Sequence, residues 1–188
     1  MPPDLIKYLS GFYSLSEEFV SHLRSAQLQK LYKKNQILSQ NTSAPLFWFI
    51  NNGLAKGCYY DADGKEHITR FWKEGEIMLL THNPIDARVH AQVIVLLENA
   101  TLSSLSPRRL LYLNNYFTET HKLSGKLLLA DRDKADLKSY LCALPSPQGY
   151  DEFKKNFPHN RILLKDIACY LEITASSLSE IRRKSRQM

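Results

Sequence analysis

The chain has 188 residues, of which 44% are hydrophobic and 23% are charged, so it should fold rather than remain disordered. This length suits one medium domain or two small ones. The net charge of +6 and the pI of about 9.2 are compatible with a nucleic-acid partner but are too moderate to establish one. No apolar run approaches the length of a membrane span, so we expect no contact with a membrane.

Three cysteines, Cys58, Cys142 and Cys169, are too few to ligate an iron–sulfur cluster alone, and none lies in a CxxC pair. The sequence contains no nucleophile–base set, no metal-ligand spacing and no glycine-rich phosphate loop. We therefore expect neither a metal site nor an enzyme. An odd number of cysteines without a signal peptide indicates reduced thiols and a cytoplasmic location.

The first part of the chain, residues 4–32, is expected to be helical. Ser16 is a suitable N-cap, because its hydroxyl can accept a hydrogen bond from a free backbone amide. Phe19, Val20 and Leu23 follow at helical spacing and form one apolar face.

From Lys33 the apolar pattern changes to short segments separated by turn residues. These segments are rich in Ile, Phe, Trp and Tyr, which predicts β-strands at residues 36–40, 46–50, 54–60, 65–72, 89–97 and 100–105. Residues 61–64 (DADG) predict a hairpin turn in which Gly64 takes a positive φ. Residues 33–106 are therefore expected to form an all-β roll or barrel.

A second helical part begins at Ser106, a predicted N-cap followed by Pro107 at the first helical position. A short helix near residues 107–114 should precede a long one with a heptad seam over three repeats. The seam consists of Leu123, Leu127, Ala130, Lys134, Leu137, Leu141 and Leu144. It predicts a parallel homodimer in which Lys134 fixes the register, although a monomer could bury the same seam against its own β-roll.

Residues 145–149 (PSPQG) are expected to break the long helix and form a hinge, followed by a short helix at 150–157. Two further helices are predicted at 164–171 and from Ala175 onward, joined by a tight turn. Thr174 is the expected N-cap of the second. This is the layout of a helix-turn-helix, whose second helix enters the DNA major groove.

An ordinary helical hairpin at a basic C-terminus is the simpler alternative. Glu172 occupies the turn position that usually carries glycine, where a left-handed backbone costs roughly 1–2 kcal/mol. The basic residues 182–186 favour the helix-turn-helix, because they directly follow the candidate recognition helix. We accordingly divide the chain into a β-roll domain with the long helix at 1–144 and a helix-turn-helix domain at 145–188.

The order of these parts resembles the cyclic-AMP receptor protein/fumarate–nitrate regulator superfamily of bacterial transcription factors, over nearly the whole chain. Residues 50–54 (INNGL), 63–67 (DGKEH) and 71–76 (FWKEGE) are similar to its strand–Gly–strand, hairpin and GE-elbow motifs. Residues 161–168 (RILLKDIA) resemble compact members from Bacteroidetes-type genomes. The resemblance implies an α+β fold with an N-terminal cyclic-nucleotide-binding-like β-roll (a jelly roll), a long dimerisation helix and a C-terminal helix-turn-helix.

The resemblance further implies a homodimeric regulator that binds double-stranded DNA at an inverted repeat, with RNA polymerase as a further partner. Polar residues early in the recognition helix should face base edges, and the basic tail should contact phosphates. The candidate DNA-binding residues are Lys165, Thr174, Ser176, Ser177, Ser179, Glu180, Arg182, Arg183, Lys184 and Arg186. Because the sequence ends at Met188, we expect the usual wing after this helix to be missing or very short.

In family members that bind cyclic nucleotides, a Glu and an Arg-Ser or Arg-Thr pair follow the GE elbow. Aligned by eye, these positions carry Leu80 and His90-Ala91, which cannot hold the ribose and the cyclic phosphate. We expect no physiological binding of cyclic AMP or cyclic GMP, no identified cofactor, and an effector that is unknown. The tentative effector pocket consists of Glu76, Leu80, Arg88 and His90. A sensor or protein-interaction module that has lost DNA binding is the alternative function.

Overall fold

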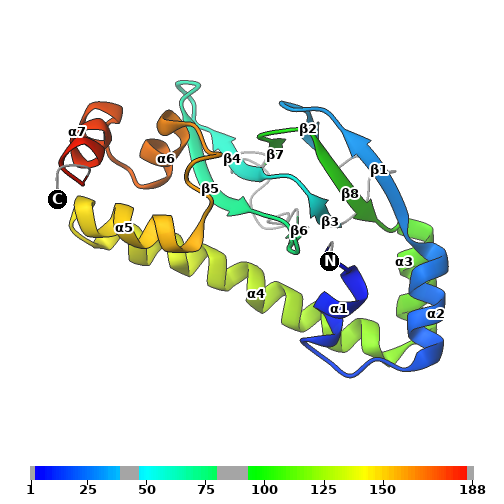
Figure 1. Ribbon diagram of the computed structural model, residues 1–188. Coiled ribbons are helices and arrows are strands. Elements are labelled where there is room, and N and C mark those ends of the chain that lie inside the picture. The colour runs from blue at the N-terminus through cyan, green and yellow to red at the C-terminus, as the bar shows by residue number, and fades with distance from the viewer. Residues whose placement is uncertain (1–2, 39–46, 80–92, 186–188) are drawn as a thin grey trace.

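A computed structural model describes residues 3–38, 47–79 and 93–185 of the chain. Its centre is a β-roll of two four-stranded antiparallel sheets (Figure 1). The first sheet has the order β1 (Leu28–Tyr32), β8 (Ala100–Ser104), β3 (Phe47–Asn52) and β6 (Ile77–Leu79). The second has the order β2 (Ile37–Leu38), β7 (Val93–Leu96), β4 (Ala55–Tyr60) and β5 (Glu66–Trp72). The predicted α+β class with an N-terminal β-roll is confirmed.

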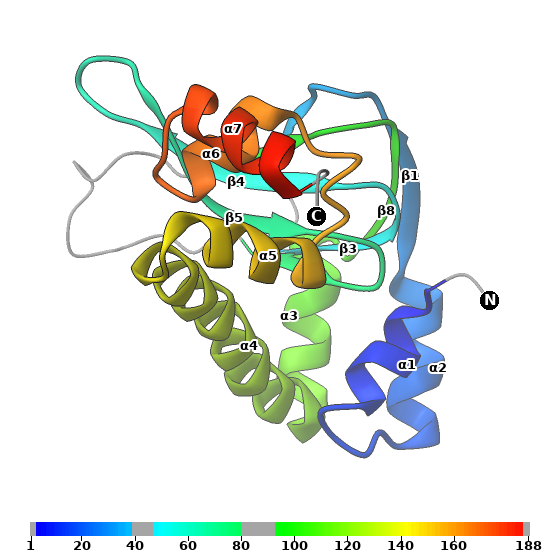
Figure 2. The same ribbon diagram turned by 60° about the vertical axis from the view of Figure 1, so that its left-hand side comes forward.

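Seven helices in the described residues cover the outer faces of the two sheets. Helices α1 (Leu5–Ser10), α2 (Glu17–Ala26), α3 (Pro107–Tyr116) and the start of α4 (Thr118–Ala143) lie against the first sheet. The second half of α4 and the helices α5 (Ser146–Asn156), α6 (Leu164–Tyr170) and α7 (Ala175–Ser185) lie against the second. Figure 2 shows α5, α6 and α7 stacked over one end of α4.

The alternation of side chains along β3 explains how one sheet serves two cores. Phe47 and Phe49 point outward into a cluster with α1–α4, whereas Trp48 and Ile50 point into the space between the sheets. Successive residues of a strand face opposite sides, so a run of four apolar residues is buried on both. All four have exposed fractions of 9% or less.

Several local predictions are confirmed by the backbone. Ser16 accepts a hydrogen bond from the Phe19 amide at 3.2 Å, and Ser106 accepts one from the Arg109 amide at 3.3 Å. Gly64 has φ of 76°, as the hairpin turn requires. The described helices include none with the length and apolar character needed to cross a membrane.

One predicted element is wrong. Residues 28–32 form strand β1 rather than helix, because they pair in full register with β8, from Leu28 opposite Ser104 to Tyr32 opposite Ala100. Strand pairing across the sheet overrides the helix-like spacing of this segment. The predicted break after the long helix is confirmed, since α4 ends at Ala143, but it is shorter than expected because α5 already begins at Ser146. Pro147 is tolerated there because the first turn of a helix needs no donor from its backbone nitrogen.

The seam of α4 faces the body of the chain, which is the monomeric alternative left open by the sequence. Leu123 is buried under the first sheet and Leu141 under the second, while Lys134 forms an ion pair with Glu76 at 2.7 Å. The remaining members, Leu127, Ala130, Leu137 and Leu144, are partly buried. The expectation of a dimer interface is corrected for Leu123 and Leu141, which are buried within the chain, and stays a prediction for the partly buried members.

The crossing of α4 and α5 yields a stability prediction. A Cβ atom at Gly149 would lie 2.7 Å from the backbone oxygen of Leu141, so a side chain there forces the helices apart. We expect Gly149→Ala to lower the free energy of unfolding by about 1–3 kcal/mol in urea denaturation. The matched control is Gly125→Ala in α4, where no atom lies within 4 Å of the added Cβ. This change should raise stability by about 0.5–1 kcal/mol, and equal effects at both positions would contradict the close crossing.

Candidate functional site

The helix-turn-helix is formed as predicted, with α6 and α7 joined by four residues. Thr174 caps α7 by accepting a hydrogen bond from the Ser177 amide at 3.1 Å. Glu172 has φ of 56°, the left-handed conformation expected at this turn position. Its carboxylate accepts a hydrogen bond from Lys138 of α4 at 2.9 Å, which glycine could not do. The strained residue therefore also ties the turn to the long helix.

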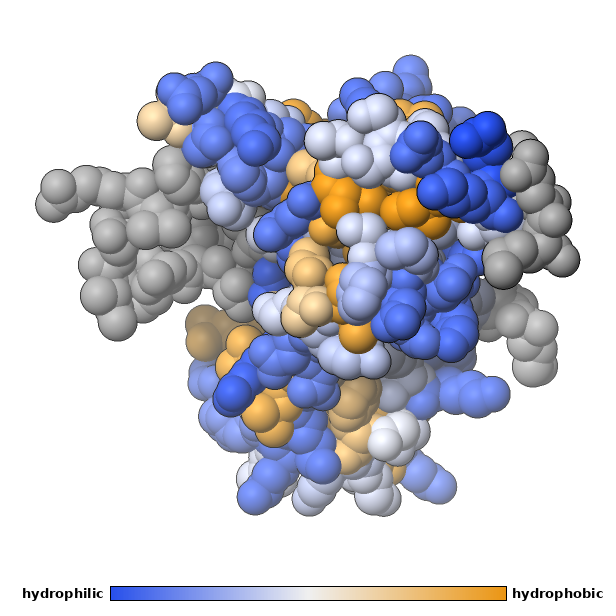
Figure 3. All heavy atoms as spheres, turned by 90° about the vertical axis from the view of Figure 1, so that its left-hand side faces the viewer, coloured by the Kyte–Doolittle hydropathy of each residue, from blue (hydrophilic) through white to orange (hydrophobic). Residues whose placement is uncertain are grey.

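The outer face of α7 is accessible. Figure 3 views the molecule from the end that carries α5–α7, where hydrophilic residues make up most of the surface. Most members of the predicted DNA-binding set are exposed to solvent, namely Lys165, Thr174, Ser176, Ser177, Ser179, Glu180, Arg183 and Lys184. Arg182 is partly buried, and Arg186 lies outside the described residues.

Local hydrogen bonds orient the serine hydroxyls of this face. The Thr174 hydroxyl lies 2.9 Å from that of Ser176 and 2.8 Å from that of Ser177. Ser179 donates to the backbone oxygen of Ala175 at 2.9 Å. A hydroxyl engaged in this way keeps lone pairs that accept further hydrogen bonds. The start of α7 therefore presents acceptors, and its end presents cations.

A buried ion group joins α6 to the β-roll. Lys56 of β4 donates to Glu66 of β5 at 2.8 Å and to Asp166 of α6 at 3.0 Å. The Lys56 and Asp166 side chains are only 8% and 3% exposed, so both charges are withdrawn from water. Burial lowers the pKa of Lys56, but the hydrogen bonds and charges of the two carboxylates outweigh it and raise the pKa overall. Burial likewise raises the pKa of Glu66, and the contacts with Lys56 reverse this and lower it.

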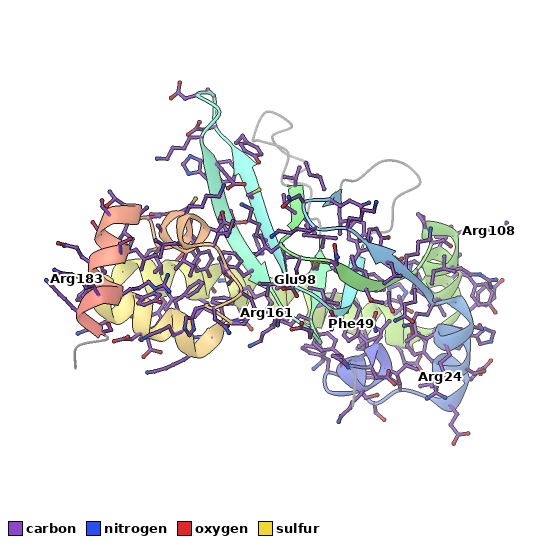
Figure 4. The ribbon with its side chains drawn as sticks, turned by 45° about the horizontal axis from the view of Figure 1, so that its top comes forward. Arg24, Phe49, Glu98, Arg108, Arg161 and Arg183 are labelled. Carbon is purple, nitrogen blue, oxygen red and sulfur yellow. The ribbon has the colours of Figure 1, made fainter. Side chains whose placement is uncertain are left out.

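A second ionic contact lies nearer the surface. The Arg161 guanidinium, which precedes α6, donates to Glu74 at 2.6 Å and to Glu98. Figure 4 shows Arg161 and Glu98 near each other between the helix-turn-helix and the β-roll. The hydrogen bonds to Glu74 and Glu98 raise the pKa of Arg161 well above its ordinary value. The contact orients the segment that leads into α6.

An aromatic cluster joins β5 to the helices α5 and α6. Phe71 of β5 packs against Phe153 and Phe157 at the end of α5 and against Tyr170 of α6, with ring centroids 5.0–5.8 Å apart. Such offset and edge-to-face pairs add to the stabilisation from burial. Residues on both sides of position 144 thus share one apolar cluster.

Polar residues missed by the sequence analysis line the contact between β5, β6 and α4. Arg70 donates to Asp131 at 2.9 Å, next to the Lys134–Glu76 ion pair. Burial raises the pKa of Asp131 more than Arg70 lowers it. Glu76 is the one member of the predicted effector pocket whose position is described; Leu80, Arg88 and His90 lie outside the described residues. Within the described stretches, His, Cys, Asp and Glu do not gather into a group that could hold a metal ion.

The signal that could have identified Arg70 and Asp131 was weak. Arg70 lies in a strand of mixed character, and Asp131 is one charge among several in residues 131–138. Only the crossing of β5 over α4 brings the two together, over 61 positions of sequence.

Comparisons with known proteins identify the fold. The sequence matches no protein-family model, and no curated protein shows significant similarity to it. A protein from Eubacterium rectale described as a transcriptional regulator of the crp/fnr family aligns with a TM-score of 0.70 at 10% identity, over 96% of this chain and 88% of that one.

Two further solved structures are similar. FixK2 from Bradyrhizobium japonicum has a TM-score of 0.72 at 13% identity, over 86% of this chain and 85% of that one. The c-di-GMP responsive global regulator CLP from Xanthomonas campestris has a TM-score of 0.63 at 11% identity, over 92% of both chains. The resemblance stated from the sequence is confirmed at the level of the fold.

The buried ion group generates a prediction. Lys56→Met retains most of the side-chain volume but leaves Glu66 and Asp166 without their cation. We expect the free energy of unfolding in urea to fall by about 3–5 kcal/mol, because breaking a buried pair leaves uncompensated charge. The control is Lys155→Met, whose side chain is 68% exposed and pairs with Glu152 at 2.6 Å. It should change stability by less than about 1 kcal/mol, and a similar loss for both variants would contradict the structural role of Lys56.

Proposed function

We propose that the chain is a DNA-binding transcription regulator of the crp/fnr type. The observation that carries this proposal is the accessible face of α7, which follows a capped turn and ends in Arg182, Arg183 and Lys184. A helix-turn-helix recognition helix needs this combination of an open face and nearby cations. The similarity to crp/fnr regulators over most of the chain supports the same function.

Two roles divide α7 in this proposal. Ser176, Ser177, Ser179 and Glu180 face the base edges, where Glu accepts a hydrogen bond from cytosine and Ser bonds several bases. Arg182, Arg183 and Lys184 contact phosphates together with Lys165 and Arg186, and these contacts position the protein without reading sequence. Thr174 holds the first turn in place. RNA polymerase is the partner such a regulator would contact once bound.

We also propose a homodimer, formed by the face of α4 opposite the seam. Leu129 and Tyr140 are 59% and 55% exposed on that face. At 100° per residue they fall on one side of the helix with Arg132 and Asp136, which form an i,i+4 ion pair. An apolar surface framed by charges suits a second copy of the same helix, and a dimer would present two copies of α7 to an inverted repeat.

The division of roles on α7 is tested by sequence selection from random DNA. Arg183→Ala should weaken binding to all sequences about equally and reduce the salt slope by roughly one unit. Ser176→Ala or Glu180→Ala should mainly change the preferred base at one position per half-site, by about 1–3 kcal/mol. Wild type should enrich an inverted repeat with half-site centres about 10 base pairs apart.

The control for these variants is Arg108→Ala. Arg108 is exposed on α3, at the opposite end of the molecule from Arg183 (Figure 4). Its loss should leave affinity and salt slope unchanged. The proposal is wrong if the wild type enriches no palindromic site and also binds DNA no better at lower salt. The chain would then be a sensor or an interaction module without DNA binding.

The dimer is tested by sedimentation at micromolar concentration. Leu129→Glu combined with Tyr140→Glu should raise the dimer dissociation constant roughly 100-fold or more, because apolar contacts are lost in both copies. Leu111→Glu on α3 is the matched control, since Leu111 is 60% exposed and lies outside α4. A monomeric wild type would refute the dimer, and monomers from Leu111→Glu would refute the choice of interface.

A further inference from the structure

An apolar cavity of about 230 Å³ lies between the outer face of the first sheet and helices α1–α4. Phe47 and Ile77 form its floor from the sheet, and Leu23 and Leu113 close it from α2 and α3. Among its described lining residues, all are apolar except Thr120 and Ser124 of α4. It is separate from the space between the sheets, because Phe47 points outward while Trp48 points inward.

The cavity is open to solvent on one side, where Ser124 and Leu128 are exposed. Open pockets with an apolar lining and a few polar groups are the usual form of small-molecule sites. An engineered apolar cavity of about 150 Å³ stays free of water and binds benzene. We propose that the cavity under α1–α4 is a binding site for a neutral, apolar small molecule, separate from the DNA-binding surface.

The polar groups of the cavity restrict the chemistry of its ligand. The Thr120 hydroxyl donates to the backbone oxygen of Leu113 at 3.0 Å. The Ser124 hydroxyl donates to the backbone oxygen of Thr120 at 2.8 Å. Both hydroxyls can therefore still accept a hydrogen bond but have no proton left to donate. No described lining residue carries a charge, so a carboxylate in the cavity would be left without a donor or a cation.

Size and access define the ligand further. If the ligand scales with cavity volume as benzene does in the engineered cavity, a molecule of about nine heavy atoms fits. An alkylbenzene has this size, and so does a medium-chain alcohol whose hydroxyl donates to Ser124 or Thr120. The partly exposed side of the cavity is formed by Leu110 of α3 and by Ser124 and Leu128 of α4. Leu128 is 54% exposed, so a ligand can enter between the two helices.

The neutral probes are ethylbenzene and 1-octanol, and octanoate is the charged counterpart. Each is titrated into the full chain without DNA, and the thermal unfolding midpoint is measured. At ten times its dissociation constant, either neutral probe should raise the unfolding midpoint by about 4 °C. Octanoate should bind at least tenfold more weakly. Leu127→Phe, which adds volume to the wall, should abolish the shift. Leu137→Phe is the matched control, since Leu137 is a partly buried seam residue of α4 that packs in another cluster.

Leucine methyl spectra of the wild type locate the ligand without any variant. The methyl resonances of Leu23 and Leu113 should shift on titration, whereas those of Leu178 should not. Shifts confined to other residues, equal affinity for octanoate, or binding that survives Leu127→Phe would each overturn the proposal.

Discussion

Within the described part of the chain, Lys56 is the cation that joins a strand of the β-roll to a helix of the helix-turn-helix, and the arrangement of the C-terminal third depends on it. A lysine with a side chain only 8% exposed is stable only beside charges that compensate it. Glu66 supplies one from the neighbouring strand and Asp166 the other from α6. Because hydrogen bonds to a buried charge are directional, they determine how α6 sits on β5. The turn and α7 follow from α6, so the direction of the outer face of α7 is set by a strand residue more than one hundred positions earlier.

Helix α4 connects the two outer cores. Its inward face is buried under the first sheet at Leu123 and under the second at Leu141, with the ion pairs of Asp131 and Lys134 between them. The buried leucines and the ion pairs fix α4 against both sheets along its length. One end of the helix cannot move relative to its sheet without breaking these contacts. The cavity lies at one of these leucines, and the helix-turn-helix packs at the other. The helix that lines the cavity is therefore the same one that holds the turn through Lys138.

The sequence predicted the local structure well wherever a single residue type determines the backbone. The caps at Ser16, Ser106 and Thr174 and the turn at Gly64 rest on one hydroxyl or one missing side chain each, and they are visible without tertiary information. It failed for β1, whose pairing partner is some 70 residues away, and for the direction of the α4 seam. The spacing of apolar residues shows that a face is buried but not which surface buries it. The contacts of Lys56 and Arg70 join residues 110 and 61 positions apart, respectively, which local patterns do not reveal.

The buried position of Asp166 has a consequence for how this sequence can diverge. Substitutions on the outer face of α7 meet only solvent, so this face can change without disturbing the fold. A substitution of Asp166 on the inner face of α6 must be matched by changes in β4 and β5, because its partner Lys56 lies in β4 and is paired in turn with Glu66 of β5. A helix-turn-helix exchanged as a whole segment therefore fits this β-roll only where its first helix supplies an equivalent of Asp166 to Lys56. Point changes on the outer face of α7 carry no such requirement.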